Sequence, residues 1–192
     1  MQNFKISYEQ VLIRMGANKY KTKVDLKNEK TILESIEFVE KVLKPKHTIS
    51  FATKKVTDNK IYLNDFVIDS KDILKLLENS NLVYGFVATI GKELDNKINF
   101  LLEEKNVYLA YIYDSIGSVA IESYVDKICN DIKTKYPKTT MRFSPGYGDW
   151  TIDNQKAFLN WLGADKIEIT LSETYQMSPR KSVSAIFGVC KL

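Results

Sequence analysis

The hydrophobic positions of the chain repeat every three or four residues in six stretches, which is the period of an amphipathic helix. Gly16, Pro45 and Gly163 follow three of these stretches as stop signals, and Ser70 precedes another as a helix N-cap. The lysine-rich residues 19–28 lack the period, so we expect a loop there. Helices are expected over residues 8–15, 32–43, 71–78, 92–103, 108–133 and 153–162.

Six shorter apolar stretches have the length of strands and are rich in β-branched or aromatic residues. Asp58 and Asn59 separate the first two stretches as a hairpin turn, and the continuous apolar run at 82–90 predicts a central strand. Because strands and helices do not alternate in a βαβ rhythm, the pattern favours the α+β class. Strands are expected over residues 47–56, 60–65, 82–90, 139–145, 167–173 and 182–190.

The composition fits one soluble domain, since 44% of the 192 residues are hydrophobic and 27% are charged. The 28 basic and 24 acidic residues give a net charge of +4 that is spread along the chain, whereas nucleic-acid-binding proteins concentrate their basic residues in one stripe. No apolar run reaches the roughly 18 residues of a membrane span, and residues 1–10 do not form a signal segment. We therefore expect a cytoplasmic protein that binds neither nucleic acid nor a membrane.

The residues that bind metals are sparse and badly spaced for that purpose. Cys129 and Cys190 stand in no metal-ligand spacing, and His47 is the single histidine. The sequence therefore predicts no metal site, and both thiols are expected to be reduced in the cytoplasm.

One segment combines residue types that suit a charged, flat ligand. Arg142 ends a predicted strand, Pro145 fixes its own φ, and Gly146 and Gly148 permit left-handed conformations that expose main-chain N–H and C=O groups. The guanidinium of Arg142 matches a carboxylate, and the ring of Tyr147 suits a flat ring or a cation. An amino-acid nucleoside with a sulfonium makes these demands. From these residues alone, a plain turn beside an arginine remains the alternative.

Four segments, in this order, resemble the activation domain of cobalamin-dependent methionine synthase: FVATIG, YDSIGSVAIES, RFSPGYGDW and LSETYQMSPRKSVSAIFG. The third contains Arg142, Gly146 and Tyr147 in the family's Arg-x-x-x-Gly-Tyr pattern. The resemblance is to compact, stand-alone members and is specific from about residue 80 onward. It implies a mixed, largely antiparallel twisted sheet with helices. It also implies one activation domain over residues 1–192, with a helical part at 1–45 and a sheet-containing, S-adenosylmethionine-binding body at 46–192.

The resemblance also implies a function. In that family cobalamin carries a methyl group and is occasionally oxidised to inactive cob(II)alamin. An electron from flavodoxin or a similar donor and a methyl group from S-adenosylmethionine then restore methylcobalamin, while the activation domain docks over the cobalamin. This chain has no Asp-x-His-x-x-Gly pattern around His47, so a partner methionine synthase chain must hold the cobalamin. We expect an accessory component without catalytic residues of its own.

Carried over onto this sequence, the resemblance gives five residues of one turn a role in binding S-adenosylmethionine. Arg142 would bind the carboxylate, and the main chain of Ser144 would meet the adenine or ribose. Pro145, which fixes φ in the turn, is counted with them, Gly146 would allow close approach, and Tyr147 would shape the pocket. A place in the core is the alternative for Tyr147.

The long helix departs from the family's pattern, which has an acidic residue where this sequence has Ser118. Asp114 and Glu122 lie one turn to either side on the same face, and one of them is expected to substitute. For Glu122 a solvated surface position is the alternative. Gly117, in the middle of this helix, indicates either close approach by a ligand or another backbone, or a helix crossing.

The last departure is at the C-terminus, where the family's multidomain enzyme continues and supplies another tyrosine. Arg180 and Lys181 in the SPRK turn would face cobalamin or a partner, or form a solvated turn. Three other functions are considered: an activator of a different corrinoid methyl carrier, a binding module of another class, and a self-contained methyltransferase. The Gly-rich loop that the last would need after a first strand is not found.

Overall fold

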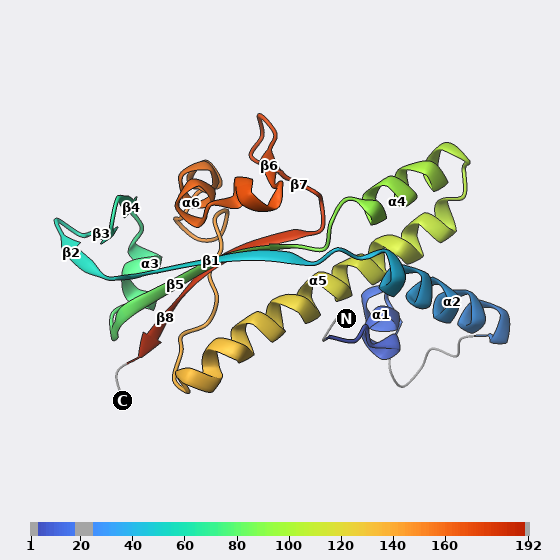
Figure 1. Cartoon of the computed structure of the whole chain (residues 1–192), viewed down its shortest axis with the longest axis horizontal. Helices are drawn as coiled ribbons and strands as arrows, with labels where there is room; N and C mark the ends of the chain where they lie inside the picture. Colours follow the sequence, from blue (N-terminus) through green and yellow to red (C-terminus); the bar gives the residue numbers. More distant parts are fainter. Residues whose placement is uncertain (1–3, 18–24, 191–192) are drawn as a thin grey trace. The chain divides into compact units, whose positions relative to one another are not determined.

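The computed structural model describes residues 4–17 and 25–190 and divides into two compact units (Figure 1). Unit 1 consists of Met1–Lys46, Thr89–Lys127 and Pro179–Lys181, and unit 2 of His47–Ala88, Ile128–Ser178 and Ser182–Leu192. The expected organisation as one activation domain stays a prediction. Among the described residues, no helix is both long and apolar enough to cross a membrane.

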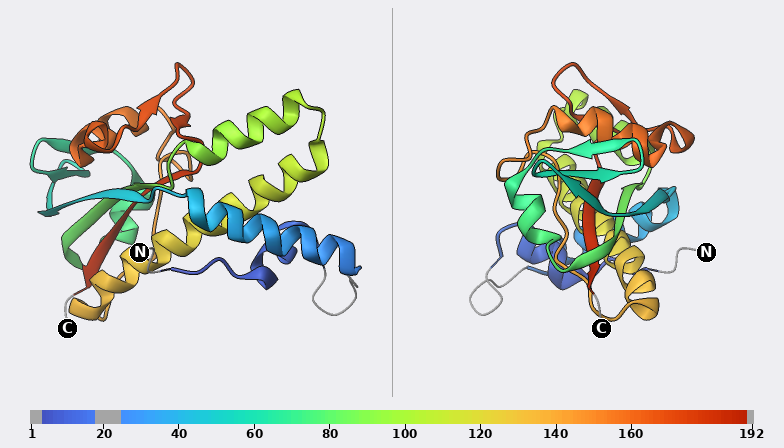
Figure 2. Two further views of the ribbon diagram at one scale, coloured as in Figure 1. Left: turned by 45° about the vertical axis from the view of Figure 1, so that its right-hand side comes forward. Right: turned by 90° about the vertical axis from the view of Figure 1, so that its left-hand side faces the viewer.

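Unit 1 is built from helices at the expected places. They are α1 (Tyr8–Arg14), α2 (Leu26–Val42), α4 (Glu93–Glu103) and the first part of α5 (Val107–Lys135); α4 and α5 follow one another as a helical hairpin (Figure 2). The apolar stripes that predicted them are the buried faces, among them Ile32, Ile36, Val39, Leu94, Ile98, Ile112 and Ile116.

The expected loop at residues 19–28 is partly wrong. Residues 19–24 lie outside the described residues, but α2 begins at Leu26. The side chain of Asp25 accepts a hydrogen bond from the main-chain N–H of Asn28 at 2.9 Å, so it caps the helix start. Lys27 and Asn28, which belong to the expected loop, lie in the first turn of this helix.

The main sheet of unit 2 has the strand order β1-β5-β8, formed by β1 (Lys46–Thr53), β5 (Ser80–Thr89) and β8 (Ser182–Cys190). The apolar run at 82–90 is therefore the central strand, as expected. The order of the main-chain contacts makes the sheet antiparallel: Lys54 bonds to Asn81 and Lys44 to Ile90, so residue numbers rise along β1 as they fall along β5. This confirms the antiparallel α+β class.

A second antiparallel sheet of unit 2 contains β2 (Lys55–Thr57), β3 (Lys60–Leu63) and β4 (Phe66–Ile68). Asp58 and Asn59 form the expected hairpin turn, with φ of +51° and +59°. The strand expected at 60–65 ends at Leu63, because Asn64 adopts a φ of +55° and begins a second turn. Helix α3 (Lys71–Leu76) follows, capped by Ser70 as expected.

The strand expected at 139–145 does not form as a continuous ladder. It meets β8 in two isolated antiparallel bridges, Thr139 to Val189 and Phe143 to Ile186, whose registers differ by one residue. The main-chain N–H of Thr140 also donates to the carbonyl of Gly188 at 2.9 Å. Between the two bridges the N–H of Gly188 bonds to the hydroxyl of Thr140 at 2.9 Å. A side chain thus takes the place of a main-chain acceptor, which interrupts the ladder.

The strand expected at 167–173 is also wrong over most of its length. A short 3₁₀ helix, η1 (Ala164–Ile167), occupies its start, and Glu168 has a φ of +63° that turns the chain. Only β6 (Thr170–Leu171) is extended, and it pairs with β7 (Met177–Ser178).

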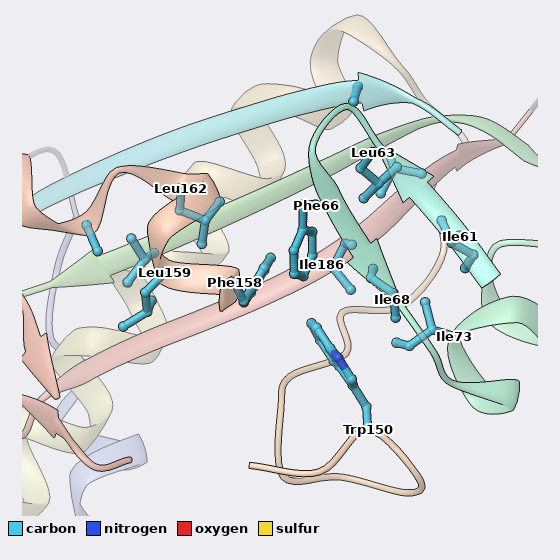
Figure 3. Close-up of a cluster of buried hydrophobic side chains, with 14 of the residues drawn as sticks. Ile61, Leu63, Phe66, Ile68, Ile73, Trp150, Phe158, Leu159, Leu162 and Ile186 are labelled. Atoms are coloured by element: carbon cyan, nitrogen blue, oxygen red, sulfur yellow. The ribbon is translucent and has the colours of Figure 1, made fainter. Parts of the chain in front are cut away.

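The core of unit 2 centres on Phe158 of α6 (Asn154–Leu162), whose ring meets three other aromatic rings. Figure 3 shows two of these partners, Phe66 and Trp150. The ring centroids lie 5.1 Å from Trp150 in an edge-on arrangement, 5.6 Å from Phe66 and 6.0 Å from Trp161. Such aromatic pairs add stability beyond the area that they bury. Phe158 therefore joins α6, the second sheet and the segment around Trp150.

Replacing Phe158 with alanine should lower the free energy of unfolding by about 3–5 kcal/mol, because it opens a cavity where three aromatic rings meet. Phe100→Ala is the matched control, since Phe100 is 52% exposed on α4 and should cost no more than about 1 kcal/mol. Urea unfolding followed by circular dichroism measures both. Equal costs would contradict the central place given to Phe158.

Candidate functional site

The segment with the candidate binding residues starts beside β8 in unit 2. The N–H of Phe143 donates to the carbonyl of Ile186 at 2.9 Å, and the N–H of Ile186 donates back to the carbonyl of Phe143 at 2.8 Å. This reciprocal pair fixes Phe143, and with it the neighbouring Arg142 and Ser144. Arg142 is exposed, and Ser144 is half-buried.

Residues 144–150 form a tight turn that is closed by its own main chain. The N–H of Gly146 donates to the carbonyl of Trp150 at 2.7 Å, and the N–H of Trp150 donates to the carbonyl of Tyr147 at 3.1 Å. Gly146 has a φ of +93°, which a residue with a side chain rarely adopts. Pro145 and Trp150 are both buried, so the core holds the turn near its two ends.

The carboxylate of Asp149 fastens this turn to the start of α3. It accepts hydrogen bonds from the Ser70 hydroxyl and from the main-chain N–H groups of Lys71 (2.7 Å) and Asp72 (3.3 Å). The carboxylate of Asp72 accepts in return from the N–H of Asp149 at 3.1 Å. Gly148, with a φ of +54°, leaves the room for this contact, because a Cβ there would overlap Oδ2 of Asp72.

These contacts lower the pKa of Asp149 below the usual value for an aspartate. The hydrogen bond from Ser70 is the largest cause, partial burial opposes it, and the main-chain bonds from Lys71 and Asp72 add to the lowering. Asp149 is therefore charged and fully engaged within the protein at neutral pH. The role of this residue is not predicted from the sequence, because Lys71 stands 78 residues earlier in the chain and only the tertiary structure brings the two together.

Arg142 and Tyr147, the two side chains best suited to contact a ligand, are exposed on this turn. Arg142 is exposed, and 68% of Tyr147 is accessible to solvent. The alternative that places Tyr147 in the core is therefore wrong, since Trp150, fully buried, is the aromatic residue that fills this part of the core. The structure thus brings Ser144, Pro145, Gly146 and Tyr147 into one turn with Arg142 at its start.

On the long helix, Lys181 brings two of the three candidate residues together in unit 1. Its ammonium lies 2.8 Å from a carboxylate oxygen of Asp114 and donates to the hydroxyl of Ser118 at 2.9 Å. The side chain of Lys181 is only 12% exposed, whereas that of Asp114 is 48% exposed. Lys181 is thus a paired, nearly buried cation, and the expectation of a solvated turn is wrong for this residue.

The space for Lys181 exists because α5 has no side chain at Gly117. A Cβ at this position would overlap the Leu94 side chain of α4 and lie 3.1 Å from Cε of Lys181. Gly117 therefore serves side-chain packing against α4 and Lys181. The neighbouring Arg180 is paired as well: its N–H donates to Asp95 at 2.7 Å, and its guanidinium donates to Asn99 at 3.0 Å.

Glu122, the third candidate on the helix, lies one turn beyond Ser118 and is exposed. The candidate residues therefore form two groups, with Asp114, Ser118 and Glu122 in unit 1 and the turn of residues 144–150 in unit 2. Within residues 4–17 and 25–190, no three His, Cys, Asp or Glu side chains are grouped as metal ligands would be.

Comparison with known proteins places the fold. No protein-family model matches the sequence, and no curated protein matches it. Among solved structures, the chain is similar to the one described as "Crystal Structure of the MetH Reactivation Domain bound to AdoHcy", with a TM-score of 0.72 and 15% sequence identity. The match covers 93% of this chain and 72% of that one. The chain therefore has the fold of the MetH reactivation domain, as the resemblance of the four segments implied.

Asp149→Asn should lower the thermal stability at neutral pH, because the neutral amide is a weaker acceptor for the three donors at α3. A carboxylate whose folded pKa is depressed stabilises the protein above its unfolded pKa, and this contribution is lost as the pH falls through the folded pKa. The difference in melting temperature between wild type and variant should therefore narrow as the pH falls below the ordinary aspartate pKa of about 3.9. Asp65→Asn, an exposed turn residue, is the control and should show no such trend. A gap independent of pH would contradict the role of the charge.

Lys181→Met keeps the aliphatic chain beside Gly117 but removes the ammonium from Asp114 and Ser118. We expect a loss of about 1–3 kcal/mol in the free energy of unfolding, which is the scale of a hydrogen bond to a charged group. Lys133→Met, on the exposed face of the same helix, should change it by less than about 0.5 kcal/mol. Chemical unfolding of both variants measures the difference, and equal effects would show that the Lys181 pair adds no stability.

Proposed function

We propose that this chain binds S-adenosylmethionine at the turn of residues 142–150 and serves to restore the cobalamin held by a methionine synthase chain. One combined observation carries the proposal. The fold is that of a reactivation domain crystallised with AdoHcy, the demethylated form of S-adenosylmethionine. In this fold the segment with the Arg-x-x-x-Gly-Tyr pattern is a firmly anchored turn that exposes its arginine and its tyrosine.

The residues of the turn fit such a ligand. Arg142 offers a planar fork for the carboxylate of an amino acid, and Tyr147 offers an exposed ring for adenine or for a sulfonium. Gly146 is exposed and has no side chain, so its main chain is open to close approach. The carbonyl of Ser144 accepts only one long bond, 3.4 Å from the N–H of Tyr147, which leaves acceptor capacity for the adenine or ribose.

The anchoring of the turn supports tight binding at low entropic cost. Pro145 and Trp150 are buried, and Asp149 is fastened to α3, so the main chain is already ordered before a ligand arrives. A site that is ordered in advance loses less conformational entropy on binding. When bound, S-adenosylmethionine supplies the methyl group. The contribution of this chain is to bind and orient that ligand, because holding two reactants in the right geometry speeds a transfer between them.

For the acidic contact on the long helix we propose Glu122. The ammonium of Lys181 already engages Asp114 and Ser118, which makes both part of the structure of unit 1. Glu122 is exposed on the same face of α5, and the resemblance of the four segments implies an acidic contact to the ligand from this helix. Glu122→Gln should therefore weaken S-adenosylmethionine more than AdoHcy, which has no positive sulfur.

The partner is proposed from the resemblance of the four segments. A methionine synthase chain would hold the cobalamin, and flavodoxin or a similar donor would supply the electron. The chain would then be an accessory component in the cytoplasm. An activator of another corrinoid methyl carrier is the alternative that shares the same turn, so the choice between them depends on the corrinoid protein that the chain restores.

Titration calorimetry of the full chain with S-adenosylmethionine tests the ligand. We expect saturable one-to-one binding, and Arg142→Ala should weaken it about 30-fold through loss of a charge-assisted pair of hydrogen bonds. Arg142→Lys should recover only part of the affinity, because an ammonium lacks the planar fork. Arg14→Ala, on the exposed end of α1, is the control and should bind normally. Normal binding by Arg142→Ala would refute the assignment of this turn.

The same proteins then test the partner, in an assay with cob(II)alamin-loaded methionine synthase and a reduced electron donor. Recovery of the methylcobalamin spectrum should require both this chain and S-adenosylmethionine, and it should fail with Arg142→Ala. Intact binding of S-adenosylmethionine without recovery would point to a different corrinoid protein.

A further inference from the structure

A second candidate site lies in unit 2 and shares no residue with the turn at 142–150. It is a groove of about 830 Å³ between α6, η1 and the hairpin of β6 and β7. Its volume is in the upper part of the range of about 300–1,000 Å³ that ligand sites occupy. Nothing in the proposed function uses it.

Two walls form the groove. One is a single face of α6, where Lys156, Leu159 and Asn160 stand three and four residues apart. The other contains Ile169 and Leu171 at the start of the hairpin and Glu173 in its turn. Leu159 and Ile169 are 4% and 5% exposed, so the base of the groove is aliphatic.

The rim of the groove is polar, and five of its polar side chains have no hydrogen-bonding or ionic partner among the described residues. These are Lys156, Asn160, Asp165, Glu173 and Tyr175. Two of these side chains are carboxylates and one is an ammonium, so the net charge of the rim is negative.

The position of Tyr175 on the rim is specified by an unusual main-chain conformation. Its φ is +61°, which is uncommon for an aromatic residue. The N–H of Tyr175 donates to the carbonyl of Ser172 at 3.0 Å, and the N–H of Gln176 donates to the hydroxyl of Ser172 at 3.1 Å. The hairpin loop therefore holds the ring at the groove.

We propose that this groove binds an extended peptide segment of a protein partner, in which an aliphatic side chain stands next to a lysine or arginine. The aliphatic base takes the apolar side chain, and Asp165 and Glu173 take the cation. Lys156 and Asn160 provide donors for the carbonyl groups of the peptide. The polar side chains of the rim stand on three elements, α6, η1 and the hairpin of β6 and β7, so a peptide segment that carries several groups meets more of them at once than a compact metabolite does.

The probe is a fluorescein-labelled peptide, Ala-Leu-Arg-Leu-Ala, titrated into the full chain and followed by fluorescence anisotropy. Its twin, with glutamate in place of arginine, tests the charge. We expect saturable binding of the basic peptide and at least about tenfold weaker binding of the acidic one. In nitrogen-15 NMR spectra, the amide shifts caused by the basic peptide should map to α6, η1 and residues 169–175.

Asp165→Lys and Glu173→Lys should each weaken the basic peptide about tenfold, because they reverse a charge at the rim. Asp65→Lys makes the same charge change on the exposed turn between β3 and β4 and should leave peptide binding unchanged. All three variants should bind S-adenosylmethionine normally, so failure here is distinguishable from failure of the proposed function.

Four results would overturn the proposal. One is a dissociation constant of the basic peptide weaker than about 1 mM, and another is equal affinity for the acidic twin. The third is a dimer, detected by sedimentation, that Asp165→Lys dissociates, since the occupant would then be a second copy of this chain. Amide shifts confined to residues 142–150 would overturn it as well, because the peptide would then bind at the other site.

Discussion

The burial of Trp150 is the constraint on which the candidate site depends. Its side chain is fully buried and meets the ring of Phe158 edge-on in the core of unit 2. The main chain of Trp150 pairs with Tyr147 and Gly146 across the turn, so the buried indole fixes the main chain that carries Tyr147, whose own side chain is 68% exposed. A turn whose end lies in the core also has little freedom to lose when a ligand binds.

The sequence predicted the elements whose hydrophobic period is long and regular. The helices of unit 1 are examples, because their apolar positions recur at the helical period and are buried. The central strand β5 was also predicted, because its apolar run is continuous. The prediction failed where a single contact interrupts the pattern. The hydroxyl of Thr140 replaces a main-chain acceptor beside β8, and Glu168 adopts a left-handed φ that a sequence does not announce for a glutamate.

The candidate site divides in the same way. Arg142, Gly146 and Tyr147 were found because turn residues and a binding pattern stand together in the chain. The roles of Asp149 and Lys181 were missed, because Asp149 meets α3 across 78 residues and Lys181 meets Ser118 across 63. Charge pairs between distant segments leave no periodic trace. Lys181 also bears on the candidate binding residues of α5, because its ammonium pairs with Asp114 and bonds to Ser118 within unit 1.

The turn and the groove differ in a way that suits different ligands. In the turn, the acidic side chain of Asp149 is hydrogen-bonded to the start of α3, and these bonds lower its pKa. The exposed groups of the turn are an arginine, a tyrosine and a stretch of main chain, a set that suits one small molecule with a carboxylate and an aromatic ring. In the groove, the polar side chains are unoccupied and stand on separate elements around an aliphatic base. Groups that are spread and unpaired gain most from a partner that is itself extended, because only such a partner reaches both walls at once.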